Sequence, residues 1–506
     1  MSSSTKKALV IGAGFAGLSV ATFLAKKGWK VTVIEKHNIP GGRARKFEAQ
    51  GFTFDMGPSW YWMPDVFERY FASFGKKVAD FYELKRLDPS YRVYFDKTHW
   101  DMPANYTALG NLLESVEPGA SKALDQFMEE AKYKYDIGVG KLVHQPGISI
   151  KEFIDFDLIK GVFKLDVFQS MKKHIARFFK HPYIQTLMEF PVLFLGALPQ
   201  NTPALYSLMN YADIKGGTWY PALGMYSIVQ AMYDTAVAQG VQFQFNEEAL
   251  KIEVVNGVAT SCLTKSTITG EQKYYAFEVV VGAGDYHHIE TKLLTSKYQS
   301  YSAQYWNTRT MAPSSLLYYV GLNKKLKGVT HHSLFFDTDF EVHGKEIYST
   351  PSWPTQPLFY ASVPSVTDPT VAPEGGENLF LLIPVAAGLE GDTEAIREKY
   401  FKELISRLEQ KWGQSIADSI VYKKSYAISD FINDYHSFKG NAYGLANTLL
   451  QTAILKPSCK SKKVNNLFYT GQLTVPGPGV PPSLISGEVV AGLIDKNYIN
   501  LQSSYV

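Results

Sequence analysis

Three glycines near the start of the chain, Gly12, Gly14 and Gly17, have the spacing of a dinucleotide-binding turn. The apolar run before them predicts a buried parallel strand over 8–11, and the residues after them predict a helix over 18–27. At this spacing the first glycine makes the turn, the second lets the backbone approach a pyrophosphate, and the third lets the helix pack closely on the strand. A pyrophosphate there lies at the positive end of the helix dipole.

An acid follows where the second strand, expected over 31–35, comes to its end at Glu35. A carboxylate at this place accepts hydrogen bonds from ribose hydroxyls and repels a 2′-phosphate, which disfavours NADP. The turn Gly41-Gly42-Arg43 comes next, and an NAD-binding domain has no evident need for it. Amine oxidase-like flavoproteins have a similar turn at this place, and that resemblance implies FAD. A purely structural glycine turn is the alternative.

The composition is that of a globular protein with two domains. The 506 residues exceed what one hydrophobic core normally supports, so one large α/β body with a second domain is expected. A net charge of +3 gives no indication of nucleic-acid binding. The 32 Tyr, 31 Phe and 8 Trp could line a large apolar cavity or a membrane-contacting face, or they could form an aromatic core.

Neither the cysteines nor the histidines predict a metal site or a disulfide framework. Cys262 and Cys459 lie far apart without metal-ligand spacing, which fits a reducing cytosol. The histidine pairs at 287–288 and 331–332 lack Cys or carboxylate partners at zinc spacing, so no metal is expected. No uninterrupted apolar run is long enough to span a bilayer, so any membrane contact is expected from one side only.

A helical insertion is expected in the first half of the chain, followed by a second sheet. The pattern predicts helices over 107–116, 121–139, 150–158 and 165–190, the last broken near Pro182, strands over 314–321, 358–363 and 379–383, and a helix over 393–412. One helix of the insertion has an apolar face flanked by basic residues. Its apolar residues are Met171, Ile175, Phe178 and Phe179, and its basic residues are Lys172, Lys173, His174, Arg177 and Lys180. Such a helix could lie on an anionic membrane or pack into the core, and both interpretations stand.

Later segments return to the nucleotide-binding domain. The pattern predicts a helix over 228–238, a hairpin turning at Asn256-Gly257, and a buried strand over 277–281. A last strand ends at Gly471, and after a Pro/Gly-rich loop a helix starts near Pro481, where its N-terminus could face the pyrimidine edge of a flavin. The FAD-binding domain is therefore expected to be discontinuous, comprising 1–105, 225–300 and 460–506. Residues 106–224 and 301–459 are expected to form the substrate-binding domain.

Five motifs spread over nearly the whole chain together resemble the bacterial phytoene desaturases. They are Gly12-Ala-Gly14-Phe-Ala-Gly17, Gly41-Gly-Arg-Ala44, Phe52-Thr-Phe-Asp-Met-Gly-Pro58, Pro364-Ser-Val-Thr-Asp-Pro369 with Ala372-Pro-Glu-Gly375, and Pro476-Gly-Pro-Gly-Val-Pro481. The segment Trp60-Tyr-Trp-Met-Pro64 looks like the versions in carotenoid-making Bacteroidetes-type bacteria. Ala249 departs from the family, which often has Val there, but the backbone usually makes that contact.

The resemblance implies a Rossmann-like FAD-binding domain beside a substrate domain of mixed sheet and helices, in the amine oxidase-like flavoprotein fold. It implies FAD, an apolar C40 polyene taken from the membrane, and successive double bonds inserted from phytoene toward lycopene. A peripheral protein on the cytoplasmic side of the membrane, with quinone or O₂ as electron acceptor, is expected. The residues expected to bind FAD are Gly12, Ala13, Gly14, Phe15, Ala16, Gly17, Glu35, Lys36, Gly42, Arg43, Gly57, Pro58, Ala249, Gly471, Gly479, Val480 and Pro481.

In the expected mechanism an allylic CH₂ gives a hydride to the flavin, and the neighbouring carbon then loses a proton. Glu152, with Asp155 three positions on, is a candidate proton acceptor, and a solvated acidic helix face is the alternative. Relatives on the same fold include carotenoid cis/trans isomerases, which would use reduced FAD, and hydroxycarotenoid 3,4-desaturases and C30 diapophytoene desaturases. An amine oxidase and a non-catalytic pigment-binding protein are more distant alternatives.

Overall fold

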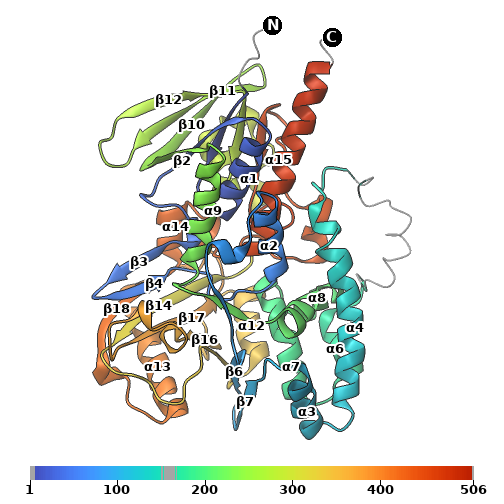
Figure 1. The fold of residues 1–506 in the computed structure, drawn as a ribbon, viewed down its shortest axis with the longest axis vertical. Coiled ribbons are helices and arrows are strands. Elements are labelled where there is room, and N and C mark those ends of the chain that lie inside the picture. Colours follow the sequence, from blue (N-terminus) through green and yellow to red (C-terminus); the bar gives the residue numbers. More distant parts are fainter. Residues whose placement is uncertain (1–5, 150–151, 153–165, 167, 504–506) are drawn as a thin grey trace.

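The computed structural model describes residues 6–149, 152, 166 and 168–503 (Figure 1). A parallel five-stranded sheet lies at the centre of the first domain, in the order β19-β13-β1-β2-β9. Its strands come from three separate stretches of the chain. They are β1 (Lys7–Ile11), β2 (Lys30–Glu35), β9 (Gln242–Phe245), β13 (Val279–Gly282) and β19 (Leu467–Tyr469).

Both faces of this sheet are covered, which explains why its central strands are apolar almost throughout. One face packs on helices, with Val10 and Val33 in a buried cluster with α1, α9 and α15. The other face, with Leu9 and Ile34, packs on a small antiparallel sheet. The helices are α1 (Phe15–Lys26), α2 (Pro64–Ala72), α9 (Tyr226–Ala238) and α15 (Val480–Ser503), and the small sheet is β10 (Glu247–Val255), β11 (Val258–Ser266) and β12 (Gln272–Ala276).

A seven-stranded mixed sheet forms the second domain, in the order β18-β14-β17-β16-β15-β6-β7. Along β14 alternate residues such as Leu316 and Tyr318 pack on α13, whereas Leu317 and Tyr319 belong to the cluster on the opposite face. The elements are β6 (Tyr91–Tyr94), β7 (His99–Met102), β14 (Ser314–Leu322), β15 (His332–Phe335), α12 (Phe340–Tyr348), β16 (Phe359–Ser362), β17 (Glu377–Val385), α13 (Glu394–Trp412), β18 (Ile420–Tyr426) and α14 (Ile428–Tyr435).

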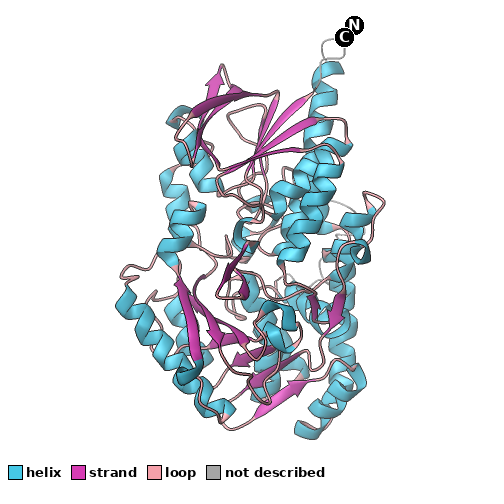
Figure 2. Ribbon diagram, turned by 60° about the vertical axis from the view of Figure 1, so that its left-hand side comes forward, coloured by secondary structure: helices cyan, strands magenta, loops and turns pink. Residues whose placement is uncertain are grey.

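Helices stand beside this sheet, and two short strand pairs lie between the domains (Figures 1 and 2). The helices are α3 (Tyr106–Val116), α4 (Ala120–Gly138), α6 (Met171–Phe178), α7 (Pro182–Glu189) and α8 (Leu208–Tyr211). The pairs are β3 (Lys46–Ala49) with β4 (Phe52–Asp55), and β5 (Leu84–Arg86) with β8 (Trp219–Pro221). The α/β fold class predicted from the sequence is confirmed. The helix expected over 150–158 lies outside the described residues, apart from Glu152.

The structure corrects one predicted boundary and decides between two interpretations. Strands β6 and β7 fall inside the segment 1–105 that was predicted for the FAD-binding domain, but β6 pairs with β15 of the second sheet, so that segment reaches too far. The apolar face of α6 lies in the protein core, where Met171 and Ile175 are fully buried, as is Phe179 directly after the helix. The core-packing interpretation of this helix is therefore correct, and its apolar face does not lie on a membrane.

Candidate functional site

The glycine turn between β1 and α1 is closed by backbone contacts that only glycine permits. A Cβ built on Gly17 would lie 2.0 Å from the carbonyl oxygen of Gly12, so helix and turn touch without a side chain between them. Gly12 has a φ of +106°, which L side chains rarely adopt. Gly14 precedes the first turn of α1 with an ordinary φ of −75°, and a Cβ there would meet only Gly42, at 3.9 Å.

Glu35 fixes this turn from the end of β2. Its carboxylate accepts hydrogen bonds from the backbone N–H groups of Ala13, at 2.8 Å, and His37, at 3.0 Å. Burial raises the pKa of Glu35, while these two N–H groups oppose the rise. The carboxylate therefore holds the glycine turn in place and also lines the adjoining cavity.

The turn Gly41-Gly42-Arg43 packs directly on the glycine turn, because a Cβ on Gly42 would lie 3.3 Å from the Cα of Gly14. The Arg43 guanidinium donates to Ser437 Oγ and to the carbonyl oxygen of Asn441, while its buried Nε has no partner in the described part of the chain. Burial lowers the pKa of Arg43, and the carboxylate of Asp285 opposes this effect. An unpaired N–H at the cavity wall fits a ligand with acceptor atoms.

The segment that carries Gly57 and Pro58 is held against this arginine from both sides. A Cβ on Gly57 would overlap the carbonyl oxygen of Arg43, so glycine is required for this close approach. Tyr319 on β14 donates its hydroxyl hydrogen to the carbonyl oxygen of Met56, at 2.6 Å. The second sheet therefore sets the position of a wall of the nucleotide-binding region.

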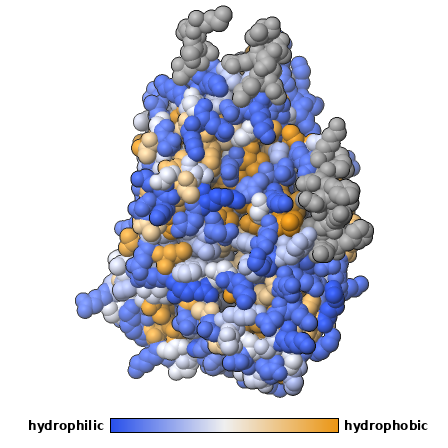
Figure 3. Space-filling model, turned by 45° about the vertical axis from the view of Figure 1, so that its right-hand side comes forward, coloured by the Kyte–Doolittle hydropathy of each residue, from blue (hydrophilic) through white to orange (hydrophobic). Residues whose placement is uncertain are grey.

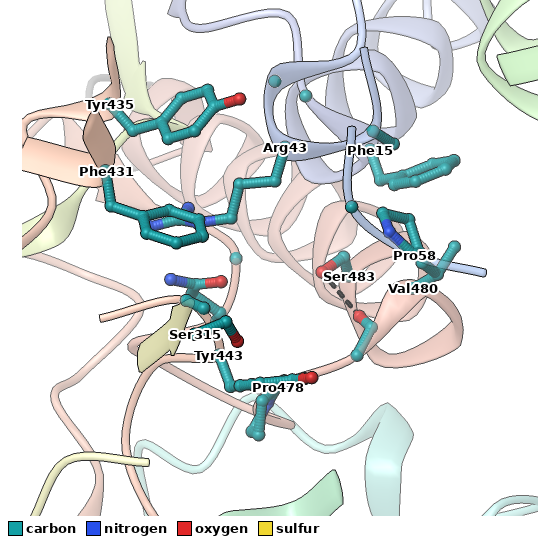
Figure 4. A pocket seen from close by; sticks show the side chains of 18 of the residues that line it. Phe15, Arg43, Pro58, Ser315, Phe431, Tyr435, Tyr443, Pro478, Val480 and Ser483 are labelled. Atoms are coloured by element: carbon teal, nitrogen blue, oxygen red, sulfur yellow. Dashed lines mark hydrogen bonds between the residues drawn. The ribbon is translucent and has the colours of Figure 1, made fainter. Parts of the chain in front are cut away.

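The C-terminal loop forms another part of the cavity wall, and its end at Val480 lies beside Pro58 (Figure 4). Gly471, Gly477 and Gly479 all have positive φ, which lets the loop turn back into α15. In the first turn of this helix Ser483 Oγ donates to the carbonyl oxygen of Gly479 at 2.8 Å (Figure 4). Figure 4 also shows Phe15, Pro58 and Val480 on one side of an open space, with Arg43 between Tyr435 and Phe431 on another.

One cavity of about 500 Å³ connects all these features. All the residues expected to bind FAD line this cavity except Ala13 and Gly17. The Ala13 N–H donates to the Glu35 carboxylate, and Gly17 packs against the Gly12 carbonyl oxygen. Sequence analysis missed Asp285, His288 and the segment 434–436 at the end of α14, which line the same region. His288 stacks on His436 at 4.0 Å, but no motif marks either residue in the sequence.

The rest of the cavity is lined by the second domain and is largely apolar. Its walls include Trp60, Phe190, Leu317, Phe336, Ile347 and Leu382. His343 also lies there, but its Nδ1 accepts from the Leu358 N–H at 3.0 Å and its Nε2 donates to the Pro384 carbonyl oxygen at 2.9 Å. Burial lowers the pKa of His343 to about 4, so the ring is neutral near pH 7 and both nitrogens are satisfied by backbone.

Glu152 is not brought to this cavity. Its carboxylate accepts hydrogen bonds from the N–H groups of Gly147, Ile148 and Ser149, at 2.7 to 3.2 Å, and so stabilises its own loop. It is absent from the described cavity walls, and its role as a proton acceptor stays a prediction.

The family described as "Flavin containing amine oxidoreductase" matches residues 15–494. The chain belongs to this family of flavoproteins. The cavity fits FAD: the glycine turn and Arg43 would hold the pyrophosphate, Glu35 the ribose, and the start of α15 the pyrimidine edge of the ring.

Known proteins resemble this flavoprotein along nearly its whole length. A carotenoid 3,4-desaturase of Haloarcula japonica is 39% identical over 95% of this chain and 96% of its own. A zeta-carotene-forming phytoene desaturase of Myxococcus xanthus is 30% identical over 97% and 94%. Among solved structures, an oxidoreductase from Methanosarcina mazei has a TM-score of 0.62 at 16% identity, over 97% of this chain and 100% of the other. A putrescine oxidase mutant has a TM-score of 0.61 at 13% identity, also over 97% and 100%. These two structures support the fold alone.

Proposed function

We propose that this flavoprotein is a carotenoid desaturase that inserts double bonds into phytoene, giving lycopene or intermediates. The observation that carries the proposal is the junction of two unlike regions in one cavity. The part of the cavity around the glycine turn, Glu35 and Arg43 carries polar groups. It opens into a part whose walls are aromatic and aliphatic side chains. Relatives at 30 and 39% identity are named as desaturases of carotenoids, which supports this substrate class.

The apolar region suits a hydrocarbon that offers no polar group for recognition. Affinity for such a substrate comes from burial, at roughly 25 cal/mol per Å² of apolar surface. Trp60 adds an aromatic wall whose orientation is fixed, because its ring stacks on His332 at 4.2 Å. Burial holds the pKa of His332 well below its usual value, so the stacked pair is uncharged.

Bound FAD supplies the hydride acceptor for oxidation of a CH–CH group. The chain itself binds the polyene along the apolar walls, orients one allylic carbon and excludes water. The Tyr319 hydroxyl fixes the segment with Gly57 and Pro58, so the wall between the two regions keeps its shape. The neutral His343 leaves no free charge at this part of the wall.

We also propose that the protein binds one side of a membrane, on the cytoplasmic face, and that quinone or O₂ reoxidises the flavin. Exposed apolar side chains occur on neighbouring loops, where Ile148, Leu450 and Leu455 are 48, 75 and 47% exposed. The loops are in contact, since a Cβ on Gly147 would lie 3.4 Å from the carbonyl oxygen of Ala453. Figure 3 shows a face on which hydrophobic side chains gather among hydrophilic ones. No helix in the described part of the chain is both long and apolar enough to cross a bilayer.

A later step of the same pathway is the second candidate. The 39% identity to a carotenoid 3,4-desaturase favours it, because that relative shares more of this sequence than the phytoene desaturase of Myxococcus xanthus does. The same cavity would then take a polyene that already carries most of its double bonds. A redox-neutral isomerase has no comparable support.

The test is to incubate the purified, FAD-loaded protein in liposomes, in separate samples, with phytoene, with lycopene and with a hydroxylated acyclic carotenoid. New double bonds lengthen the conjugated system and move the absorption bands to longer wavelength, whereas isomerisation alone leaves the mass unchanged. Loss of two hydrogens per step from phytoene supports the first proposal, and reaction of the other polyenes alone supports the second. Unchanged mass with all three polyenes, with a suitable quinone present, would refute both.

A further inference from the structure

A buried lysine lies behind the C-terminal loop of the cavity. Lys456 is only 4% exposed, and its Nζ donates to Asn447 Oδ1 at 2.7 Å. Within the described residues no carboxylate pairs with it, and Asn447 is the one side chain that accepts from its ammonium. A buried ammonium without a counterion is costly to a protein and calls for a functional explanation.

The lysine contacts the loop at Gly477, which has a φ of +137°. A Cβ on Gly477 would overlap Lys456 Nζ and lie 3.1 Å from Asn447 Oδ1, so the ammonium occupies the space that any side chain at 477 would take. The next loop residues, Pro478 and Gly479, line the cavity, whereas Lys456 does not. The ammonium therefore contacts a loop residue whose next two neighbours in sequence form part of the cavity wall.

The segment of Lys456 is also tied to this loop. Thr474 donates its hydroxyl hydrogen to the carbonyl oxygen of Pro457 at 2.6 Å. Pro457 directly follows Lys456, and Thr474 lies three residues before Gly477 in the loop. The hydrogen bond between them therefore holds the lysine against the loop. The ammonium and the first turn of α15 then present positive potential to the same side of the cavity.

We propose that Lys456 is a positioning residue for redox chemistry: acting through the loop, its charge stabilises the reduced, negatively charged state of the flavin bound in this cavity. A hydrocarbon is a poor hydride donor, so a flavin that is easily reduced favours its oxidation. Burial lowers the pKa of Lys456 to about 7, and an added negative charge in the cavity would restore the ammonium. The inference rests on FAD in this cavity and not on which polyene is oxidised.

The test measures the midpoint potential of the bound FAD by dye-coupled reductive titration, with no polyene present. In Lys456→Met the equilibrium constant for reduction is expected to fall about tenfold or more, because a nearby unit charge at low effective dielectric is removed. The matched control is Lys460→Met, since Lys460 Nζ also donates to an asparagine, Asn497 Oδ1, at 3.1 Å, but is not buried. Its potential is expected to equal that of the wild type.

A second variant covers the case in which Lys456→Met does not fold. Asn447→Asp keeps the shape and sets a carboxylate against the ammonium, so it is expected to lower the potential in the same direction. A Lys456→Arg variant keeps the charge and is expected to keep the potential. Full FAD content with an unchanged potential in Lys456→Met, or in Asn447→Asp, would overturn the proposal. Because a purely structural lysine affects melting and FAD content but not the potential, the two roles give different results.

Discussion

Gly17→Ala and Gly14→Ala are expected to impair the protein in different ways, although both glycines belong to one turn. The first should lower stability, and the second should lower the affinity for FAD. At Gly17 the new Cβ would lie 2.0 Å from the Gly12 carbonyl oxygen and 3.2 Å from Ala283 Cβ. An unstrained carbon–oxygen contact is about 3.3 Å or longer, so α1 must move away from the turn by more than about 1 Å. Because the obstructing atom belongs to the backbone and cannot rotate away, the free energy of unfolding is expected to fall by about 3 kcal/mol or more.

At Gly14 the backbone has no such obstacle, because the nearest atom to the new Cβ is Gly42 Cα at 3.9 Å. The change from glycine to alanine at this N-cap position costs about 1 kcal/mol or less. However, Gly14 lines the cavity, so the methyl group takes up space that the pyrophosphate requires. The FAD dissociation constant is expected to rise about tenfold or more, which corresponds to about 1.4 kcal/mol.

Two assays separate these effects. Thermal unfolding of the apoprotein is expected to shift by about 6 °C or more in Gly17→Ala, taking about 2 °C per kcal/mol, and by much less in Gly14→Ala. Titration with FAD, followed by flavin fluorescence, is expected to show weak binding in Gly14→Ala despite its normal melting. Equal melting temperatures for the two apoprotein variants, or normal FAD affinity in Gly14→Ala, would refute the reasoning.

Four further changes test two residues of the cavity wall, one buried carboxyl group outside it, and the loop that carries Glu152. Glu35→Gln removes a charged acceptor of the Ala13 and His37 N–H groups, so FAD affinity measured by titration is expected to fall about tenfold; unchanged affinity would contradict this. Burial raises the pKa of Asp55 from 3.8 to about 6, so its contribution to stability is complete below about 3.8 and is lost as pH rises through about 6. The difference in unfolding free energy between wild type and Asp55→Asn should fall by up to about 3 kcal/mol over that interval, and a flat difference would argue against it. Glu152→Gln is expected to keep full turnover, since its carboxylate bonds only its own loop; loss of turnover with normal FAD content would restore it as a proton acceptor. Leu382→Asn sets a polar group in the apolar wall, so KM for the polyene is expected to rise about tenfold with FAD retained, and an unchanged KM would place the substrate elsewhere.

Local sequence predicted the cofactor side of this fold because the requirements there are local. The glycine turn, Glu35 and the Gly41-Gly42-Arg43 turn each have a backbone reason within a few residues, and the structure brings them together at one cavity. The α/β fold and most helices followed from periodicity for the same reason.

Contacts between residues far apart in the sequence could not be predicted from local patterns. Strand β6 pairs in parallel with β15, from Arg92 with Ser333 to Tyr94 with Phe335, and no nearby residue signals a partner so distant in the chain. The role of α14 in the nucleotide region is equally hidden, since Asp434 meets Arg45 at 2.8 Å only after both domains have folded. His343 would count as a polar group in the sequence, and only its backbone partners show that it presents none to the cavity.

The order of synthesis adds a constraint that follows from the central sheet. Strand β19 and helix α15 are made last, yet β19 pairs with β13 and Ser19 on α1 bonds the Leu484 carbonyl oxygen of α15 at 2.6 Å. The ribosome must therefore release nearly all of the described chain before the coenzyme can be enclosed. Until then the edge of the short apolar strand β13 that later pairs with β19 is unpaired, and such edges favour aggregation of newly made chains. Supply of the vitamin-derived coenzyme and assistance by chaperones should thus govern how much soluble protein a cell recovers.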